Sequence, residues 1–258
     1  MIAALVIASF VVATITLIAV WVGPRLLPQS IAFEMDPDAP KPFGYRMAWL
    51  AIHTDDTAQV ADLLGLAEGT PANWNSGIGT VYDDELGSSR LFLSPPIEGW
   101  TFVIGLSLPH PAGPAFVDKL TPLLLRLGQA FDDVQYYFTY PLIDFFAWVR
   151  VRDGRLVRAF AIGDEGVIWN KGRLTPEERA LGMRLFDLRG VRERAGDIGG
   201  ELVLYPTEEQ VLQIARSWGL DPMSLARNDV QPGQGYVVRV PREWRAERVY
   251  NGSRSRAA

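Results

Sequence analysis

Residues 134–170 have the sequence VQYYFTYPLIDFFAWVRVRDGRLVRAFAIGDEGVIWN, and this stretch decides the fold. It is rich in aromatic and β-branched residues, which favour strands. Asp153-Gly154 in its middle is a two-residue hairpin signal, because these residue types tolerate the positive φ angles of a type I′ turn. The stretch predicts an antiparallel meander with strands at Val134–Tyr140, Asp144–Arg152, Leu156–Ile162 and Gly166–Asn170.

The chain on either side of the meander contains further strand patterns. Residues 99–108 are apolar on both faces, which is typical of a strand at the centre of a sheet. Residues 68–76 are mostly polar and predict a loop. The other expected strands are Tyr45–His53, Gly77–Tyr82, Arg90–Ser94 and Gly235–Val240.

Two helices are expected before the meander. One follows Thr54 as its N-cap and ends at Gly65, since glycine adopts the left-handed conformation that closes many helices. The other covers residues 115–130, whose leucines recur at helical spacing. Pro122 must start this helix behind Thr121 as its cap, or kink it.

Two further helices, after the meander, begin with capping boxes. In each, a threonine hydroxyl accepts from the amide three residues later, and the side chain of that residue reaches back. Thr175 pairs in this way with Glu178, and Thr207 with Gln210. Together these patterns predict an α+β domain over residues 44–241, with a mostly antiparallel sheet and flanking helices.

The first residues of the chain, Met1–Val22, are apolar and carry no charge. As a helix they would be about 33 Å long, enough to cross a bilayer core. Trp21 suits the membrane interface, and Gly23-Pro24-Arg25 ends the pattern. We therefore expect residues 1–23 to be an uncleaved single-pass anchor in the cell membrane.

Two alternatives to the anchor remain open. A cleaved signal peptide needs a basic start, a shorter apolar core and a small-residue cleavage site, and the sequence offers none of these clearly. A buried core helix seldom stays apolar on every face for so long.

Residues 24–43 and 242–258 flank the predicted domain. The first segment is proline-rich and predicts an extended, semi-rigid linker. The second is rich in arginine and is expected to be a flexible tail. Arg25 and Lys41 follow the anchor, and this bias favours a cytoplasmic domain under the positive-inside rule.

Composition excludes several kinds of site. The chain of 258 residues has no cysteine and two histidines, so thiolate or histidine-rich metal sites and cysteine nucleophiles are excluded, and no cofactor or metal is expected. The net charge of −5 includes the basic tail, which leaves an acidic body. That charge argues against nucleic acid as the main partner.

His53 is the one candidate for acid–base chemistry. It ends a predicted strand and is followed closely by Asp55 and Asp56, so a carboxylate could assist it as a general base. The structural alternative is that both acids lie in the first turn of the next helix, where the helix dipole favours them. His110 lies in a proline-rich loop and is given no role.

Aromatic residues supply the candidates for partner binding, because tyrosine and tryptophan are over-represented at protein interfaces. They are also ordinary core material, and Trp74 is the exception because it lies in a predicted polar loop. The residues proposed to contact a partner are Asn73, Trp74, Tyr136, Tyr137 and Trp169.

Three segments, ANWNSGI at 72–78, FLSPPIEGWTFVIG at 92–105 and VLQIARSWGLDP at 211–222, carry a resemblance. They resemble a family of uncharacterised bacterial proteins, over roughly residues 45–225. The resemblance implies one α+β domain, and it brings no activity or catalytic residues.

The sequence therefore predicts a membrane-anchored, non-enzymatic domain that binds a protein, as in a sensor or an immunity-type protein that blocks a toxin. Its bilayer contact would run through residues 1–22. The alternative is a membrane-anchored hydrolase or transferase that uses His53 and nearby carboxylates.

Overall fold

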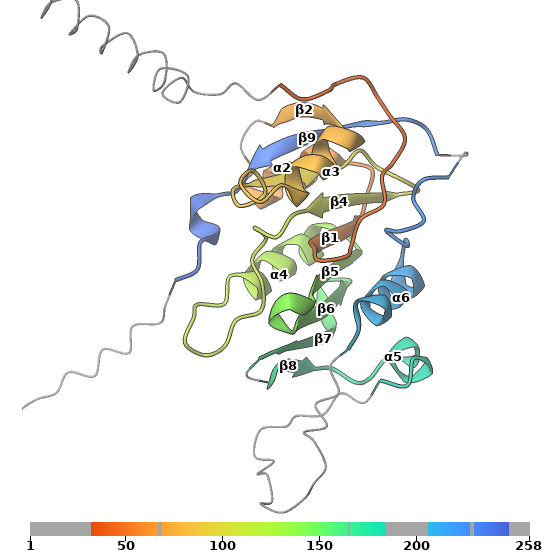
Figure 1. Ribbon diagram of the computed structural model, residues 1–258. Helices are drawn as coiled ribbons and strands as arrows, with labels where there is room; N and C mark the ends of the chain where they lie inside the picture. Colours follow the sequence, from red (N-terminus) through yellow and green to blue (C-terminus); the bar gives the residue numbers. More distant parts are fainter. Residues whose placement is uncertain (1–31, 67–68, 165, 184–205, 228–229, 248–258) are drawn as a thin grey trace, which may run out of the picture. The chain divides into compact units, whose positions relative to one another are not determined.

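The computed structural model describes residues 32–66, 69–164, 166–183, 206–227 and 230–247 (Figure 1). The chain divides into residues 1–32 and a second unit that begins at Phe33, and the elements below belong to the second unit. The predicted transmembrane helix, Met1–Val22, and the tail from residue 248 onward lie outside the described residues. Within the described ranges, no helix is long and apolar enough to cross a membrane.

The described residues form one antiparallel sheet of nine strands, which confirms the predicted α+β class. Every pair of neighbouring strands is antiparallel. Their spatial order is β2 (Thr70–Asn73), β9 (Gln234–Arg239), β3 (Arg90–Leu93), β4 (Trp100–Ile104), β1 (Ala48–His53), β5 (Asp133–Tyr140), β6 (Phe145–Arg152), β7 (Arg155–Gly163) and β8 (Gly166–Lys171).

Helices cover both faces of this sheet (Figure 1). The helices α3 (Trp74–Tyr82), α5 (Pro176–Ala180) and α6 (Glu208–Trp218) lie on one face, called here the α6 face. The helices α2 (Thr57–Leu64) and α4 (Leu120–Ala130) lie on the other, the α4 face. Each face therefore has its own hydrophobic core.

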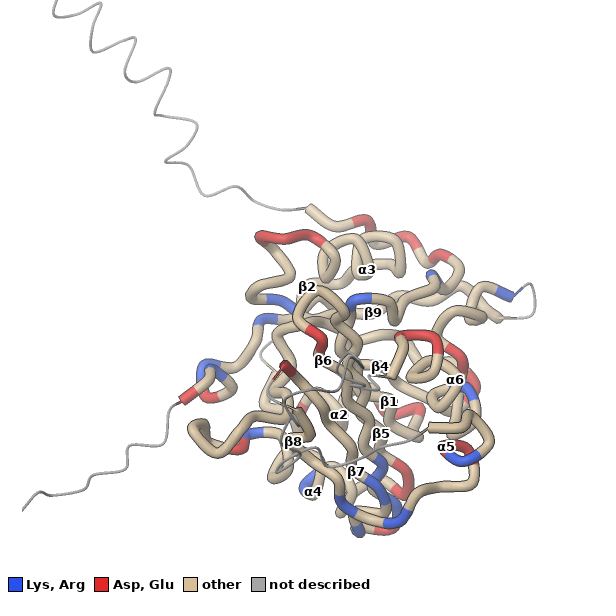
Figure 2. Tube along the Cα trace, turned by 60° about the horizontal axis from the view of Figure 1, so that its bottom comes forward, with Lys and Arg blue, Asp and Glu red and all other residues tan. Residues whose placement is uncertain are grey.

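The two-sided cover explains the apolar central strands. All five residues of β4 are buried, as are the first five of β1. Charged residues lie mainly in the helices, turns and connecting segments around the sheet, while β1 and β4 carry none (Figure 2). The predicted central position of residues 99–108 is confirmed, since β4 lies between β3 and β1.

The predicted meander is confirmed as β5, β6, β7 and β8, which pair in sequence order. Asp153 and Gly154 join β6 to β7 with φ angles of 48° and 73°, as a type I′ turn requires. Both predicted capping boxes are present, at the starts of α5 and α6.

Two predicted helix starts are wrong. The N-cap of α2 is Asp56, whose carboxylate accepts from the Gln59 amide, and Thr54 instead accepts from the amide of Asp56. The helix predicted from residue 115 begins only at Leu120. The Asp118 carboxylate accepts from the first helical amides there, and Pro122 falls within the first turn, which tolerates proline.

Most of the loop predicted at 68–76 and the strand predicted at Gly77–Tyr82 are also wrong, because residues 70–82 form β2 and α3. The side chain of Asn73 caps α3 by accepting from the Ser76 amide at 2.9 Å. Gly77 lets the helix lie directly on β3, since a Cβ atom there would be 2.2 Å from the Phe92 ring. This packing depends on a residue distant in the sequence, so local propensity does not reveal it.

Part of the segment predicted as a linker is packed against the domain. Asp38 accepts hydrogen bonds from the amides of Trp74 at 2.6 Å and Asn75 at 3.0 Å, at the start of α3. It also forms a β-bridge with Gly233, and Phe43 is buried. The second unit thus begins at Phe33, before the predicted boundary at residue 44.

Candidate functional site

A cavity of about 710 Å³ lies at the α4 face, beside the ends of several strands. Its walls come from the segment between β4 and α4, the ends of β5 and β6, the β7–β8 turn and the segment after β9. The apolar side chains in these walls include Leu106, Leu108, Phe138, Phe145, Ile168 and Trp244. We call it the His110 cavity, after the histidine in its wall.

The segment between β4 and α4 forms one wall of the cavity, and it contains no helix or strand. Pro109, Pro111 and Pro114 deny it backbone donors and helical geometry. It is held at its two ends instead. The Gly105 amide donates to the Ala48 carbonyl at 2.9 Å, and the Val117 amide donates to the Glu247 carbonyl at 2.8 Å.

His110 is an exposed residue in the lining of this cavity. Its ring lies 5.9 Å from the rings of both Phe138 and Phe145, measured between centroids. Burial lowers the pKa of His110, although a hydrogen bond with the Leu108 backbone acts in the opposite direction. The lowered pKa favours the neutral imidazole.

Charged side chains also line the cavity. Lys119 donates to Glu247 at 2.9 Å, and this hydrogen bond is the main reason why the pKa of Glu247 is lowered. Arg245 and Asp164 are exposed. The charged lining residues are thus two cations and one carboxylate.

Apolar residues are exposed around the cavity on two adjacent segments. Leu142 and Ile143 are 70% and 56% exposed in the short helix η1 (Pro141–Ile143), which joins β5 to β6. Phe116 and Val117 are each 37% exposed in the segment before α4. Ile143, Phe116 and Val117 also line the cavity, so its opening has an apolar border.

The predicted grouping of His53 with Asp55 and Asp56 is not what the structure contains. His53 Nδ1 lies 3.0 Å from Oδ1 of Asp132, just before β5, and the His53 ring lies 5.0 Å from the Trp100 ring. The hydrogen bond from His53 is the main cause of a lowered pKa at Asp132. The pair is exposed, and His53 lines none of the three cavities described in this section.

The five residues predicted to bind a partner are all buried. Asn73 caps α3, and Trp74 packs edge-on against Phe92 with ring centroids 5.3 Å apart. Tyr137 stacks on Trp49 in the core of the α6 face, with ring centroids 4.9 Å apart. The exposed fractions are 4% for Asn73, 9% for Trp169 and 0% for Trp74, Tyr136 and Tyr137. In this structure these five buried side chains stabilise the fold.

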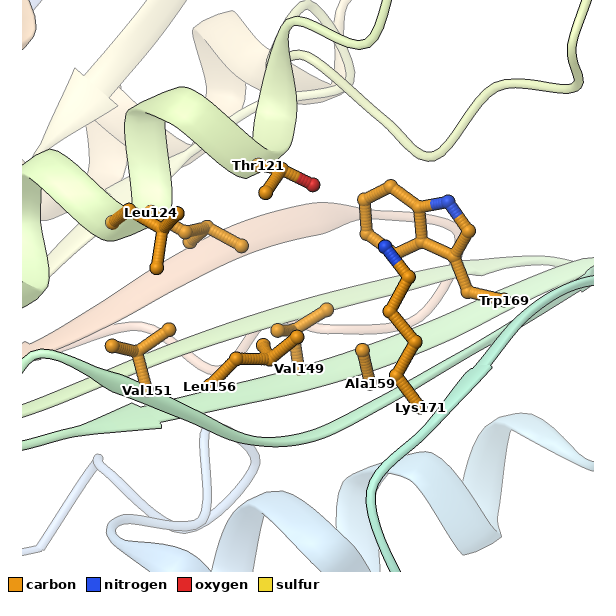
Figure 3. A pocket seen from close by; sticks show the side chains of 9 residues that line it. Thr121, Leu124, Val149, Val151, Leu156, Ala159, Trp169 and Lys171 are labelled. Atoms are coloured by element: carbon orange, nitrogen blue, oxygen red, sulfur yellow. The ribbon is translucent and has the colours of Figure 1, made fainter.

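Trp169 borders a small hollow between α4 and the sheet (Figure 3). Thr121 and Leu124 of α4 face Val149, Val151 and Leu156 across it, and Lys171 lies over the Trp169 ring, with Nζ 5.0 Å from the ring centroid. The volume of about 10 Å³ is close to that of a single water probe. The hollow is therefore a packing gap and not a ligand site. A third cavity, of about 40 Å³, lies around Leu225 and Arg227.

The α6 face is instead crossed by buried polar contacts. The Arg158 Nε of β7 donates to both oxygens of Glu178 in α5, at 2.7 and 2.9 Å, and both side chains are fully buried. Trp148 Nε1 also donates to Glu178, at 2.8 Å. Nearby on this face, Arg150 donates to Asp133.

These geometries carry no metal-binding pattern. Over the part of the chain that the structure describes, no group of three His, Cys, Asp or Glu side chains could hold a metal ion. Comparison of the chain with protein-family models, curated proteins and solved structures finds no match.

Proposed function

We propose that this chain is a non-enzymatic binding protein, held at a membrane by residues 1–22, and that the His110 cavity is its binding site. The proposal is based on this cavity. Its volume of about 710 Å³ lies within the range of roughly 300–1,000 Å³ found for ligand pockets. Its mainly apolar walls, with a few polar groups, are also typical of such pockets.

The partner expected from the sequence is a protein, as for a sensor or an immunity-type protein. The exposed residues Leu142 and Ile143 support this part of the proposal, because a contiguous apolar surface beside a pocket is typical of interaction sites. In this account Asn73, Trp74 and the other buried aromatic residues hold the shape of the domain. The proposed location is the cell membrane, with the domain on the cytoplasmic side.

Trp244 offers a direct test of binding, because it lines the cavity and is 8% exposed. The full-length protein in lipid nanodiscs is titrated with a brominated decanol, a neutral apolar molecule whose bromine quenches tryptophan fluorescence on contact. Subtracting the signal of a Trp244→Phe variant isolates the contribution of this residue from the other seven tryptophans. We expect saturable quenching of Trp244.

Ala112 and Ala180 provide matched controls for that titration. Ala112 lines the cavity, whereas Ala180 is exposed in α5 on the opposite face. Ala112→Phe adds a ring to the cavity wall and should weaken the saturable quenching, and Ala180→Phe should leave it unchanged. Quenching that rises linearly with bilayer concentration of the probe, or that Ala112→Phe does not alter, contradicts the proposed site.

A hydrolase or transferase that uses His53 is the second candidate function. The observation that favours it is the hydrogen bond between the exposed His53 ring and Asp132, which would fix the ring orientation of a general base. The full-length protein would be assayed against carboxylic and phosphoric esters. Turnover that His53→Gln abolishes and His110→Gln retains supports this candidate, and absence of turnover in the unaltered protein contradicts it.

A further inference from the structure

We propose that the His110 cavity binds the acyl chain of an anionic amphiphile, such as a fatty acid or an acidic lipid. This inference rests on the proposed function, because it assumes that the cavity is a binding site. It adds the chemical class of the ligand inside the cavity, whereas the protein partner would contact the exposed apolar residues beside it. Two properties of the cavity support it: its mainly apolar walls, and an exposed arginine, Arg245, among its lining residues.

The interior suits a group that needs no hydrogen bonds. Leu106, Leu108, Phe138 and Phe145 supply apolar wall. A hydrocarbon chain gains free energy from leaving water for such a surface. A charged or strongly polar ligand would lose its hydration without compensation.

A peptide in an extended conformation fits this interior less well. Its amide and carbonyl groups would need partners in the walls, since an unpaired buried amide is costly. Two of the polar wall groups are already hydrogen-bonded within the protein. The Ser107 hydroxyl donates to the Gly87 carbonyl at 2.7 Å, and the Ser89 carbonyl accepts from the Val240 amide.

The rim determines the expected head group. Arg245 is exposed at the rim and forms no ion pair with another described residue, whereas the neighbouring cation Lys119 is paired with Glu247. Because Lys119 is paired with Glu247, Arg245 is the cation of the lining on which the expected head group depends. A carboxylate or phosphate at the end of an acyl chain would meet the Arg245 guanidinium as its chain enters.

The opening is also suited to taking a chain from a bilayer. Leu142 and Ile143 are exposed on η1, and Val117 is exposed on the segment across the opening. Apolar side chains on loop tips can enter the interfacial region of a membrane, where they shield a chain that moves into the cavity. The apolar stretch Met1–Val22 would keep this domain near such a membrane.

The test uses a palmitate analogue with a photoreactive diazirine at mid-chain and, in parallel, its methyl ester, which has the same chain without the charge. The full-length protein in nanodiscs of zwitterionic lipid is labelled with each probe. Mass spectrometry then locates the labelled residues. We expect the palmitate analogue to label residues of the cavity wall, and Ala112→Phe to weaken this labelling while Ala180→Phe retains it.

Arg245→Gln tests the head group. It should weaken the apparent affinity for the palmitate analogue by about threefold, in the range of an exposed ion pair, and leave labelling by the methyl ester unchanged. Equal labelling by the two probes in the unaltered protein would overturn the anionic specificity. Labelling confined to residues 1–22 would overturn the acyl-chain inference.

The two proposals can fail separately. If brominated decanol quenches Trp244 but neither photoprobe labels the cavity, the cavity is a binding site and the acyl-chain inference is overturned. If neither experiment detects a ligand in the cavity, both proposals fall.

Discussion

The two faces of the sheet are built differently. On the α6 face, buried ion pairs and stacked aromatic rings fill the space between the sheet and its helices, as Arg158–Glu178 and Trp49–Tyr137 illustrate. On the α4 face, α2 and α4 cover part of the sheet with apolar side chains, and the His110 cavity remains beside them. Both faces therefore have a hydrophobic core, and they differ in that the α6 face adds buried polar contacts whereas the α4 face has the cavity at which we propose binding.

Breaking the Arg158–Glu178 pair should have the largest effect on stability. Glu178→Leu leaves a fully buried arginine without its carboxylate, and we expect the free energy of unfolding to fall by about 3–5 kcal/mol. The double variant Arg158→Met with Glu178→Leu should recover much of this loss, because no charge is then left unpaired. Chemical denaturation of the full-length proteins measures both, and a loss below about 1 kcal/mol for Glu178→Leu would contradict this account.

A matched pair of tryptophan substitutions compares the two faces directly. Ala215 is buried at 1% exposure in α6, so Ala215→Trp overpacks a filled core and should cost about 1–3 kcal/mol or more. Ala112→Trp enters the His110 cavity and should change the free energy of unfolding by no more than about 0.5 kcal/mol. Thermal unfolding of both variants gives the comparison, and equal destabilisation would mean that the cavity wall tolerates no added volume.

The anchoring of residues 33–43 to α3 should have a smaller effect. Asp38→Ala removes the carboxylate that accepts from Trp74 and Asn75, and we expect a loss of about 1 kcal/mol, the usual contribution of an N-terminal cap. Asp36→Ala is the control, because Asp36 contacts Asn73 through its backbone carbonyl. Urea unfolding curves of the two variants should differ in midpoint, and coincident curves would argue that Asp38 does not stabilise α3.

The pH dependence of His110 should be the smallest effect. Burial lowers the pKa of His110 in the folded state, so below about pH 6.5 the unfolded chain takes up a proton that the folded chain does not. The stability conferred by a neutral His110 is therefore present above that pH and is lost as the pH falls toward the folded-state pKa. We expect His110→Phe to flatten the fall in melting temperature between about pH 7 and pH 5. An unchanged slope in His110→Phe would contradict the prediction.

Local signals in the sequence predicted the parts of the fold that depend on local chemistry. Asp153-Gly154 specifies its own turn, and the pairs Thr175–Glu178 and Thr207–Gln210 specify their own helix starts. Helix α3 escaped prediction because it depends on Asp38 and Phe92, which lie far from it in the sequence.

The candidate site escaped prediction for the same reason. The walls of the His110 cavity come from distant segments, and His110 belongs to no recognisable motif. One signal was present: residues 105–119 form a long, proline-rich connection, and connections of that length are often functional. The aromatic residues predicted to bind a partner are instead buried. Composition cannot distinguish an aromatic residue of the core from one at an interface, because both places are rich in them.

The quenching of Trp244 by a brominated ligand, set against that of Trp148, tests the central claim most directly. Trp148 is fully buried on the α6 face, and Trp244 lines the cavity on the α4 face. This account predicts that Trp244→Phe removes a saturable component of quenching and that Trp148→Phe does not. Identical quenching curves for the unaltered protein and Trp244→Phe would contradict the claim that the α4 face binds a ligand.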